Sequence, residues 1–482
     1  MGLLGILIAL GLLIWLAYRG WSVLLLAPAA AILAAALAGQ PLLAHWTQTF
    51  MESAARFVAQ FFPIFLLGAL FGKLMEDSGS VTSIAKIMTE RLGHRRAVLA
   101  VVLAGAIVTY GGVSLFVAFF VLAPMAHQLF RSAAIPRRLM PGAIALGTTT
   151  FTMSALPGTP AIQNAIPTPF FGTTPFAAPG LGIIAALVMF GFGMWWLGRA
   201  ERNARAAGEG YGEEVSPKDA ADDLVVRERA TTASSFDPPE ATHGAPSDAG
   251  PPIALAALPL VVVVAVNLLM SLVVLPRIDA SFLAEKEWDS TSLGAVGGVW
   301  AVVTALFAAI LVLIAINYRR LPALRDSMDA GANASVLPVL SVASLVGFGS
   351  VVAALPAFAT VRDWVLGIEG GPLVSLAVAT NVLASLTGSA SGGLTIALDA
   401  LGATYLKIAH EQGIDPGLLH RVAVIGAGTL DTLPHNGAVV TLLAVCNSTH
   451  RESYLDIVMV SIVGGLLALA VVIILGSAVG SF

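Results

Sequence analysis

Two ionisable side chains flank a Leu-Pro dipeptide in an apolar stretch near the C-terminal end of the chain. Asp431 and His435 lie on either side of Leu433–Pro434. A carboxylate beside an imidazole can exchange a proton near neutral pH, and ionisable groups at membrane depth are costly enough to be functional candidates by default. The pair therefore predicts a proton-coupling site. The structural alternative is that Asp431 caps the helix restarting after the proline while His435 donates to a nearby carbonyl.

The surroundings of this pair repeat a region of the first half of the chain. Residues 109–162 contain TYGGVS and then SALPGTPAI, and residues 387–439 contain TGSASGG and then DTLPHNGAV. One constant offset pairs Gly111 with Gly388 and Leu156–Pro157 with Leu433–Pro434. Glycine and proline interrupt helices, and a membrane tolerates broken backbone only where protein or a water-filled cavity satisfies it. Matched interruptions in two halves indicate the binding site of a secondary transporter.

Hydroxyl and amide side chains at the four interruptions are candidates to bind a carboxylate or a hydroxyl group. New helix N-termini suit an anion, and new carbonyl ends suit a cation or a proton donor. The candidate binding residues are Thr109, Gly111, Gly112, Ser114, Thr152, Ser154, Gly158, Thr159, Asn164, Thr387, Gly388, Ser389, Ser391, Thr432 and Asn436. The alternative is that the Ser and Thr residues only cap broken ends or allow close helix packing. Asp399 is a weaker coupling candidate, with a pair to Lys407 or a capping role as its alternative.

Composition sets the class of the protein. Of 482 residues, 57% are hydrophobic and 11% charged, and the mean hydropathy is +0.87. Ordinary soluble domains carry about 25% charged residues, so the sequence predicts an integral membrane protein. The net charge of -4 comes without a basic tract that would suggest nucleic acid, and the single Cys446 excludes an intramolecular disulfide. No HExxH, GxSxG or Cys/His cluster is present, so we expect no enzyme, no cofactor and no metal site.

The order of apolar segments predicts two repeats joined by a linker. Residues 1–198 form the first, with scaffold helices, a hairpin at 97–129 and a broken helix at 139–177. Residues 199–250, rich in Glu, Asp, Ser, Pro and Gly, predict a flexible linker. Residues 251–482 form the second, with scaffold helices, a hairpin at 372–409 and a broken helix at 418–447. Two full spans need about 40 residues plus a turn, so re-entrant hairpins fit better. The expected fold is an all-α inverted repeat with about ten spanning helices, two opposed re-entrant hairpins and two broken helices.

Loop charge predicts orientation. Three groups of basic residues are cytoplasmic by the positive-inside rule: Lys73, Lys86, Arg91, Arg95 and Arg96; Arg199, Arg202 and Arg205; Arg319, Arg320 and Arg325. We therefore expect a multi-pass protein of the cell inner (plasma) membrane with both termini outside. All Arg and Lys lie near segment ends, so no permanent positive side chain is expected in a broken-segment core. Helix ends supply roughly half a charge each, which favours a small monocarboxylate over a polycarboxylate.

Three blocks of sequence resemble the gluconate permease (GntP) family of the ion transporter superfamily. They are ALPGTPAIQNAIPTPFFGT (155–173), TNVLASLTGSASGG (380–393) and GTLDTLPHNGAVVTLLAVCNSTHRESY (428–454). The second and third are most similar to 3-hydroxybutyrate permease-like members. The family resemblance implies proton symport of a hydroxylated monocarboxylate of the gluconate or 3-hydroxybutyrate type. The superfamily implies a homodimer that moves in an elevator-like way, with a static scaffold and a mobile domain containing both hairpins.

Three rival functions remain open from the residues. A Na⁺-coupled organic-acid transporter would hold its ion on the carbonyls around Thr387–Gly393. A membrane-embedded enzyme would need a nucleophile–base pair or a metal cluster, and the chain offers only His435 near Asp431. A channel would leave the matched breaks without a purpose. The expected partners are therefore a small organic-acid anion, a proton, the lipid bilayer and a second copy of the chain.

Overall fold

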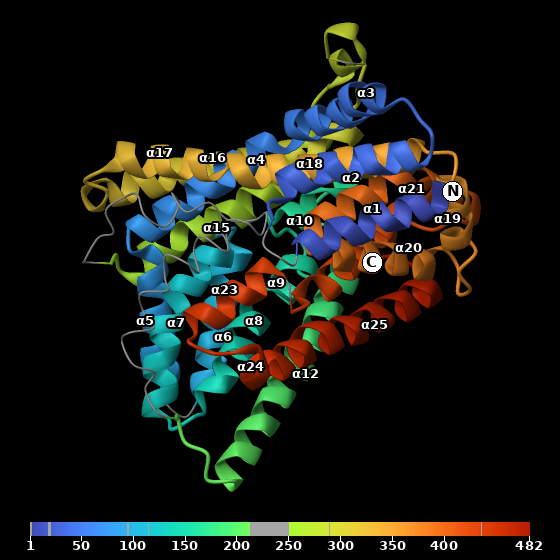
Figure 1. Cartoon of the computed structure of the whole chain (residues 1–482). Helices are drawn as coiled ribbons and strands as arrows, with labels where there is room; N and C mark the ends of the chain where they lie inside the picture. Colours follow the sequence, from blue (N-terminus) through green and yellow to red (C-terminus); the bar gives the residue numbers. More distant parts are fainter. Residues whose placement is uncertain are drawn as a thin grey trace.

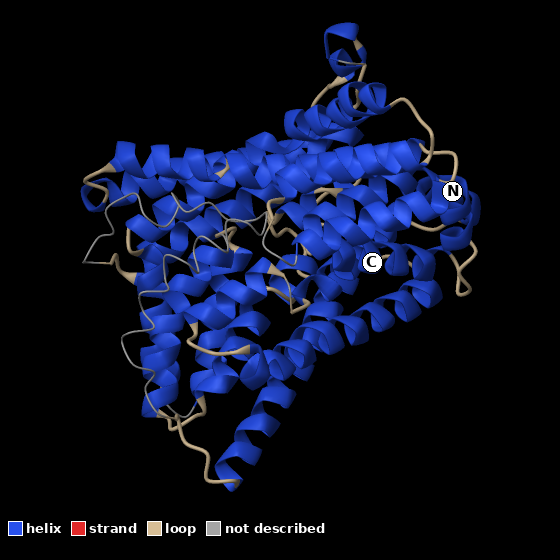
Figure 2. Ribbon diagram, in the orientation of Figure 1, coloured by secondary structure: helices blue, strands red, loops and turns tan. Residues whose placement is uncertain are grey.

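The computed structural model describes residues 2–17, 21–93, 96–113, 115–212, 250–288, 290–434 and 436–482. Within these residues every regular element is a helix (Figure 2). Six helical stretches of this described part are long and apolar enough to cross a membrane: Leu42–Asp77, Pro179–Ala206, Ile253–Arg277, Leu293–Arg320, Leu324–Ala354 and His450–Val479. The predicted all-α membrane class is confirmed.

The first half contains short helices around the predicted interruptions and long helices elsewhere. Helix α4 ends where Gly79 takes a left-handed conformation (φ 72°), which lets the chain turn into α5. The elements are α1 (Gly2–Ala17), α2 (Val23–Leu37), α3 (Leu42–Ala44), η1 (His45–Phe50), α4 (Met51–Asp77), α5 (Ser80–Leu92), α6 (Ala97–Tyr110), α7 (Leu115–Ser132), η3 (Arg137–Leu139), α8 (Met140–Thr148), α9 (Phe151–Ser154), α10 (Ile162–Ala165), α11 (Pro167–Phe171) and α12 (Pro179–Ala206).

The second half follows a similar order after residue 250. Its main helices are α15 (Ile253–Leu269), which continues as η5 (Met270–Val274), α16 (Leu293–Asn317), α17 (Leu324–Ala334), α18 (Val336–Ala354), α19 (Phe358–Leu366), α20 (Pro372–Thr387), α21 (Ala390–Gln412), α22 (Pro416–Thr429), α23 (Gly437–Val445), α24 (His450–Ile457) and α25 (Gly464–Val479). The short elements are η6 (Leu275–Arg277), η7 (Ser281–Ala284), η8 (Lys286–Trp288), η9 (Tyr318–Arg320), η10 (Leu430–Thr432) and η11 (Val458–Val463).

Two pairs of helices are joined by short turns. Helices α6 and α7 pack against each other across the turn that contains Gly112, whose φ is +97°. Helices α20 and α21 pack in the same way across Gly388, whose φ is +63°. Left-handed backbone is routine for glycine and costly for other residues. We call these pairs the first hairpin and the second hairpin.

The helices form two packed groups (Figure 1). Helices α4, α16, α17 and α18 lie together in the upper part of the view, and α6, α8, α12, α24 and α25 lie in the lower part. Within the upper group α18 packs against α4 and α2, and within the lower group α12 packs against α25. Glycine allows the closest approaches: a Cβ on Gly393 of α21 would meet the Ala384 nitrogen of α20 at 2.2 Å. Such contacts between small residues hold helices together in lipid.

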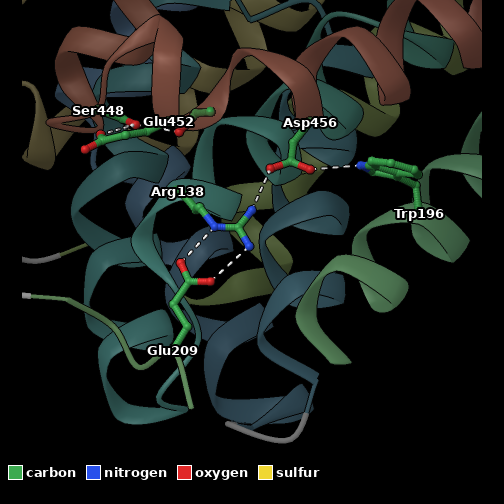
Figure 3. A network of polar contacts seen from close by, with 7 residues as sticks. Arg138, Trp196, Glu209, Ser448, Glu452 and Asp456 are labelled. Atoms are coloured by element: carbon green, nitrogen blue, oxygen red, sulfur yellow. Dashed lines mark hydrogen bonds and ion pairs between the residues drawn. The ribbon is translucent and has the colours of Figure 1, made fainter. Parts of the chain in front are cut away.

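A polar network ties the two halves together where α8, α12 and α24 meet (Figure 3). Arg138 forms an ion pair with both oxygens of Glu209, at 2.8 and 3.0 Å, and reaches Asp456 at 3.4 Å. Trp196 Nε1 donates to the other Asp456 oxygen at 2.9 Å. Helix α12 runs to Ala206 and Glu209 is fixed beyond it, so the start of the segment that we predicted to be a flexible linker is ordered. Residues 213–249 of that segment lie outside the described residues.

Candidate functional site

A cavity of about 220 Å³ lies where the first hairpin meets α4, α18 and the chain between α8 and α10. Its polar lining residues are Thr109, Thr148, Ser335, Ser391 and Gln163. The other lining residues are Ile64, Phe65, Gly68, Ala69, Gly112, Val113, Leu115, Met153, Pro160, Ala161, Ile162, Ala334, Pro338 and Val342. No lining residue is charged. Such a site suits a small ligand with a carbon backbone and several hydrogen-bonding groups.

The turn of the first hairpin packs directly on the first break, which comprises residues 155–161 between α9 and α10. Thr109 Oγ1 lies 2.8 Å from the Gly105 carbonyl and 3.1 Å from Thr152 Oγ1. A Cβ on Gly112 would meet the ring of Pro160 at 2.8 Å, so glycine is required for this contact. The cavity wall is therefore continuous from the hairpin turn to the break.

Asn164 holds the first break in shape and does not face the cavity. Its Nδ2 donates to Thr159 O at 3.0 Å and to Pro175 O at 2.9 Å, and its side chain is fully buried. The neighbouring Gln163 lines the cavity instead. Ser154 donates to the Thr150 carbonyl, while Thr159 Oγ1 accepts the Ala161 N–H. These three candidate binding residues therefore stabilise the chain around the first break and do not line the cavity.

Arg421 corrects one sequence-based expectation. We expected no permanent positive charge in the broken segments, yet this arginine of α22 is fully buried. It donates to Ala177 O at 2.7 and 3.2 Å, to Ser154 O at 3.4 Å and to Asn164 Oδ1 at 3.3 Å. As the sixth residue of α22 it resembled an interfacial end in the sequence, but the chain between α11 and α12 folds over it.

His420, which the sequence did not single out, completes this cluster. Its Nδ1 pairs with Thr173 Oγ1 at 2.7 Å and its Nε2 with Asn164 Oδ1 at 3.2 Å. The adjacent His-Arg dipeptide in an apolar helix was the available signal. Two further contacts fix the first break: Tyr110 donates to Pro157 O at 2.8 Å, and Asn267 of α15 donates to Gly158 O at 2.9 Å.

The second break, residues 433–436, is joined to the turn of the second hairpin by Asp431 and Asn436. Asp431 Oδ1 accepts the N–H of Ala390, the first residue of α21, at 2.8 Å. Asn436 Nδ2 donates to Asp431 Oδ1 at 2.9 Å and to Gly388 O at 2.8 Å. Asn436 Oδ1 caps α23 by accepting the Ala438 N–H. The capping role that we considered for Asp431 therefore belongs to Asn436.

The hydroxyl groups near the second hairpin differ in what they contact. Ser389 accepts the Gly392 N–H at 3.2 Å and lies 3.3 Å from Ser391 Oγ. Thr387 donates to the Leu383 carbonyl. Thr432 Oγ1 is buried and has no hydrogen-bond partner among the described residues. In the second half, Ser391 is the candidate binding residue that lines the cavity.

Four other candidates remain: Gly111, Asp399, Ser114 and His435. Gly111 packs on Leu260 of α15, where a Cβ would meet that side chain at 2.2 Å. Asp399 accepts a hydrogen bond from Ser350 at 2.6 Å, and Lys407 pairs with Glu411, so the Asp399–Lys407 alternative is wrong. Ser114 and His435 lie outside the described residues.

Comparison with known proteins identifies relatives along the whole chain. Residues 1–190 match the family described as GntP family permease. The chain is 42% identical over 481 residues, 98% of each chain, to YxjC of Bacillus subtilis (strain 168), named as an uncharacterized transporter. A stretch of 106 residues, 21% of this chain and 23% of the relative, is 39% identical to the high-affinity gluconate transporter of Escherichia coli (strain K12).

A solved structure shares the fold. MtrF of Neisseria gonorrhoeae, described with a class of antimetabolite efflux pumps, matches with a TM-score of 0.53. The match covers 90% of this chain and 85% of the other at 14% identity. At that identity the likeness concerns the fold alone.

Proposed function

Because this chain belongs to the GntP permease family and is a transporter, we propose that it takes up a small hydroxylated monocarboxylate together with a proton. The observation that carries the proposal is the cavity of about 220 Å³ between the first hairpin, the first break and helices α4 and α18. The name of the gluconate transporter relative supports an organic-acid substrate. Gluconate and 3-hydroxybutyrate represent the substrate class.

The lining of the cavity supports one carboxylate and hydroxyl groups on a short carbon chain. Ser391 and the amide of Gln163 provide donors and acceptors, while Met153, Ile162 and Val342 provide apolar surface. The hydroxyls of Thr109, Thr148 and Ser335 donate to backbone carbonyls and keep lone pairs as acceptors. A dicarboxylate would bring two negative charges into the cavity, and each buried unpaired ion costs several kcal/mol. The lining provides no charged side chain.

Asp431 is the proposed proton carrier. Among the described residues Ala390 and Asn436 both donate to its Oδ1, which leaves Oδ2 to take the proton. The N-terminus of α21 stabilises the ionised form. Protonation removes a charge that would otherwise move through a low-dielectric environment. His435 is the proposed exchange partner.

The architecture that we propose is the inverted repeat with about ten spans and two opposed re-entrant hairpins. The offset that pairs Gly111 with Gly388 in the sequence places each at a hairpin turn in the structure. The cavity lies between hairpin elements and the helices α4 and α18, so an elevator-like movement of the hairpins would carry it from one side to the other. A homodimer in the inner membrane with both termini outside completes the proposal.

Sodium coupling is the second candidate, and the second hairpin offers it less support. The Gly388 carbonyl accepts the Asn436 amide, and the Ser389 carbonyl accepts the Thr387 hydroxyl at 3.2 Å. These two carbonyls of the predicted ion site are therefore engaged by side chains. A Na⁺ ion there would have to share both with these donors.

A thermal-shift screen of the purified protein tests the substrate class. A ligand that binds only the folded state raises the unfolding temperature in proportion to RT ln(1 + [L]/Kd). Short hydroxy monocarboxylates should raise it, while dicarboxylates of equal length and the matching neutral amides should not. Stabilisation by dicarboxylates alone would contradict the proposed substrate class.

A further inference from the structure

Arg421 places a permanent positive charge inside the protein without a negative partner in the described part of the chain. The side chain is fully buried, and its hydrogen bonds end on the carbonyls of Ala177 and Ser154 and on the Asn164 amide oxygen. None of the ion pairs among the described residues includes it. These neutral acceptors bind the guanidinium N–H groups but leave the charge without a direct ionic partner, which is costly in a low-dielectric interior.

The charge lies directly behind the cavity wall. Arg421 binds Ser154 and Asn164, and their sequence neighbours Met153 and Gln163 line the cavity. Arg421 therefore contacts the residues that follow two cavity-lining residues in the sequence. Two charges in the poorly screened interior of a protein interact far more strongly than the same two charges do in water. The Arg421 guanidinium would thus stabilise an anion in the cavity without contacting it.

We propose that Arg421 is the fixed counter-charge of the transported anion, and that one proton accompanies each monoanion so that transport is electroneutral. This inference rests on the proposed function. In the empty form Arg421 (+1) balances ionised Asp431 (−1). In the loaded form Arg421 balances the substrate carboxylate, and Asp431 carries the proton. Loading without the proton would leave one uncompensated negative charge.

Other ionisable groups near Asp431 do not change this balance. Helix α20, which packs against η10, has no titratable side chain. From α24, His450 and Tyr454 contact the carbonyls of Pro434 and Thr432. On α21 the nearest carboxylate in the sequence is Asp399, which is exposed and bonded to Ser350. The remaining titratable or charged groups on these helices are His420 and Arg421 on α22, Tyr405, Lys407, His410 and Glu411 on α21, and Arg451, Glu452 and Asp456 on α24. Of these, Lys407 and Glu411 pair with each other.

The first test measures voltage dependence in the unmodified protein. Proteoliposomes carry a fixed inward proton gradient while potassium and valinomycin set the membrane potential to zero, inside-negative or inside-positive. We expect the same initial rate of 3-hydroxybutyrate uptake at all three potentials and no net current. A rate that changes several-fold with potential would overturn the inference while leaving proton-driven uptake intact. Absence of any proton-driven uptake would instead refute the proposed function.

The second test asks whether Arg421 acts through its charge. Arg421→Gln should raise the Km for 3-hydroxybutyrate on the order of tenfold, while competition by the neutral 3-hydroxybutyramide should change little. Arg421→Lys should keep most of the preference for the anion. Arg325→Gln, at an exposed residue of α17, is the matched control. Equal weakening of anion and amide binding would show that Arg421 only holds the break together. If Arg421→Gln does not fold, Arg421→Lys still tests whether the charge is needed, and the voltage measurement tests electroneutral transport separately.

Discussion

Asp431 Oδ1 accepts a hydrogen bond from the Ala390 N–H at 2.8 Å, although the two residues are far apart in the sequence. The bond places a carboxylate at the N-terminus of α21, where helix dipoles favour negative charge. It also links the second break to the turn of the second hairpin. A change in the protonation of Asp431 therefore alters a contact that the second break shares with the second hairpin.

Replacing Asp431 by Asn tests its role in coupling. The amide oxygen can still accept the Ala390 N–H, but the side chain can no longer carry a proton. We expect Asp431→Asn to abolish accumulation driven by a pH gradient while counterflow exchange of substrate stays measurable. Radiolabelled uptake and counterflow in the same vesicles provide both readouts.

Asp415→Asn is the control for that substitution. Asp415 caps α22 by accepting the Gly417 N–H, and Asn caps helices about as well as Asp. Both activities should be unchanged in this variant. Full pH-driven accumulation by Asp431→Asn would exclude Asp431 as the proton carrier.

Asn436 should matter because it holds the second hairpin to the second break, and Ser389 because it caps α21 at the hairpin turn. Asn436→Ala removes the bonds to Gly388 O and Asp431, and Ser389→Ala removes the cap on α21. Each lost buried hydrogen bond should weaken uptake by about 1–3 kcal/mol, with the protein still folded. Unchanged kcat/KM in both variants, measured beside their thermal unfolding, would show that these contacts of the second hairpin turn are not needed for transport.

Ser391 links the second half to the cavity. Ser391→Ala should raise the Km for substrate by about 5- to 30-fold, the equivalent of one hydrogen bond of about 1–2 kcal/mol. Ser461→Ala removes a buried hydroxyl that has no partner among the described residues and does not line the cavity, so its Km should match the wild type. If both variants behave alike, Ser391 does not contact substrate.

Cysteine labelling tests the proposed topology. Cys446 is buried and is first replaced by Ala to give a background without cysteine. Ser281→Cys, beside Ala280, should react with an impermeant maleimide from outside, whereas Arg319→Cys, beside Arg320, and Ala207→Cys should react only from the cytoplasm. Labelling of Ser281→Cys and Arg319→Cys from the same side would refute the inverted repeat.

The sequence was most informative about where helices stop. Glycine at the turns and proline at the breaks act locally. The ends of α6 at Tyr110 and of α20 at Thr387 therefore follow from the positions of glycine in the sequence. Side-chain direction was less predictable. Gln163 and Asn164 are neighbours in α10, yet Gln163 lines the cavity whereas Asn164 binds the first break. Consecutive residues of a helix point in different directions, so the two side chains lie on different faces.

Contacts between distant segments could not be read from the sequence. Arg421 is near the start of its segment and becomes buried only because the chain around Ala177 folds over it. Asp431 reaches α21 rather than its own helix restart. Ser335 lines the cavity and lies between α17 and α18, outside the repeated motifs. Each depends on how the halves pack, which local pattern does not encode.

The most direct test of proton-coupled uptake is accumulation in proteoliposomes that contain only the purified protein. With an acidic exterior, a neutral interior and no other gradient, radiolabelled 3-hydroxybutyrate or gluconate should accumulate saturably above its external concentration. Collapse of the pH gradient with a protonophore should release it. Accumulation that requires a sodium gradient and ignores the pH gradient, or equilibration without accumulation under every gradient, would contradict proton symport.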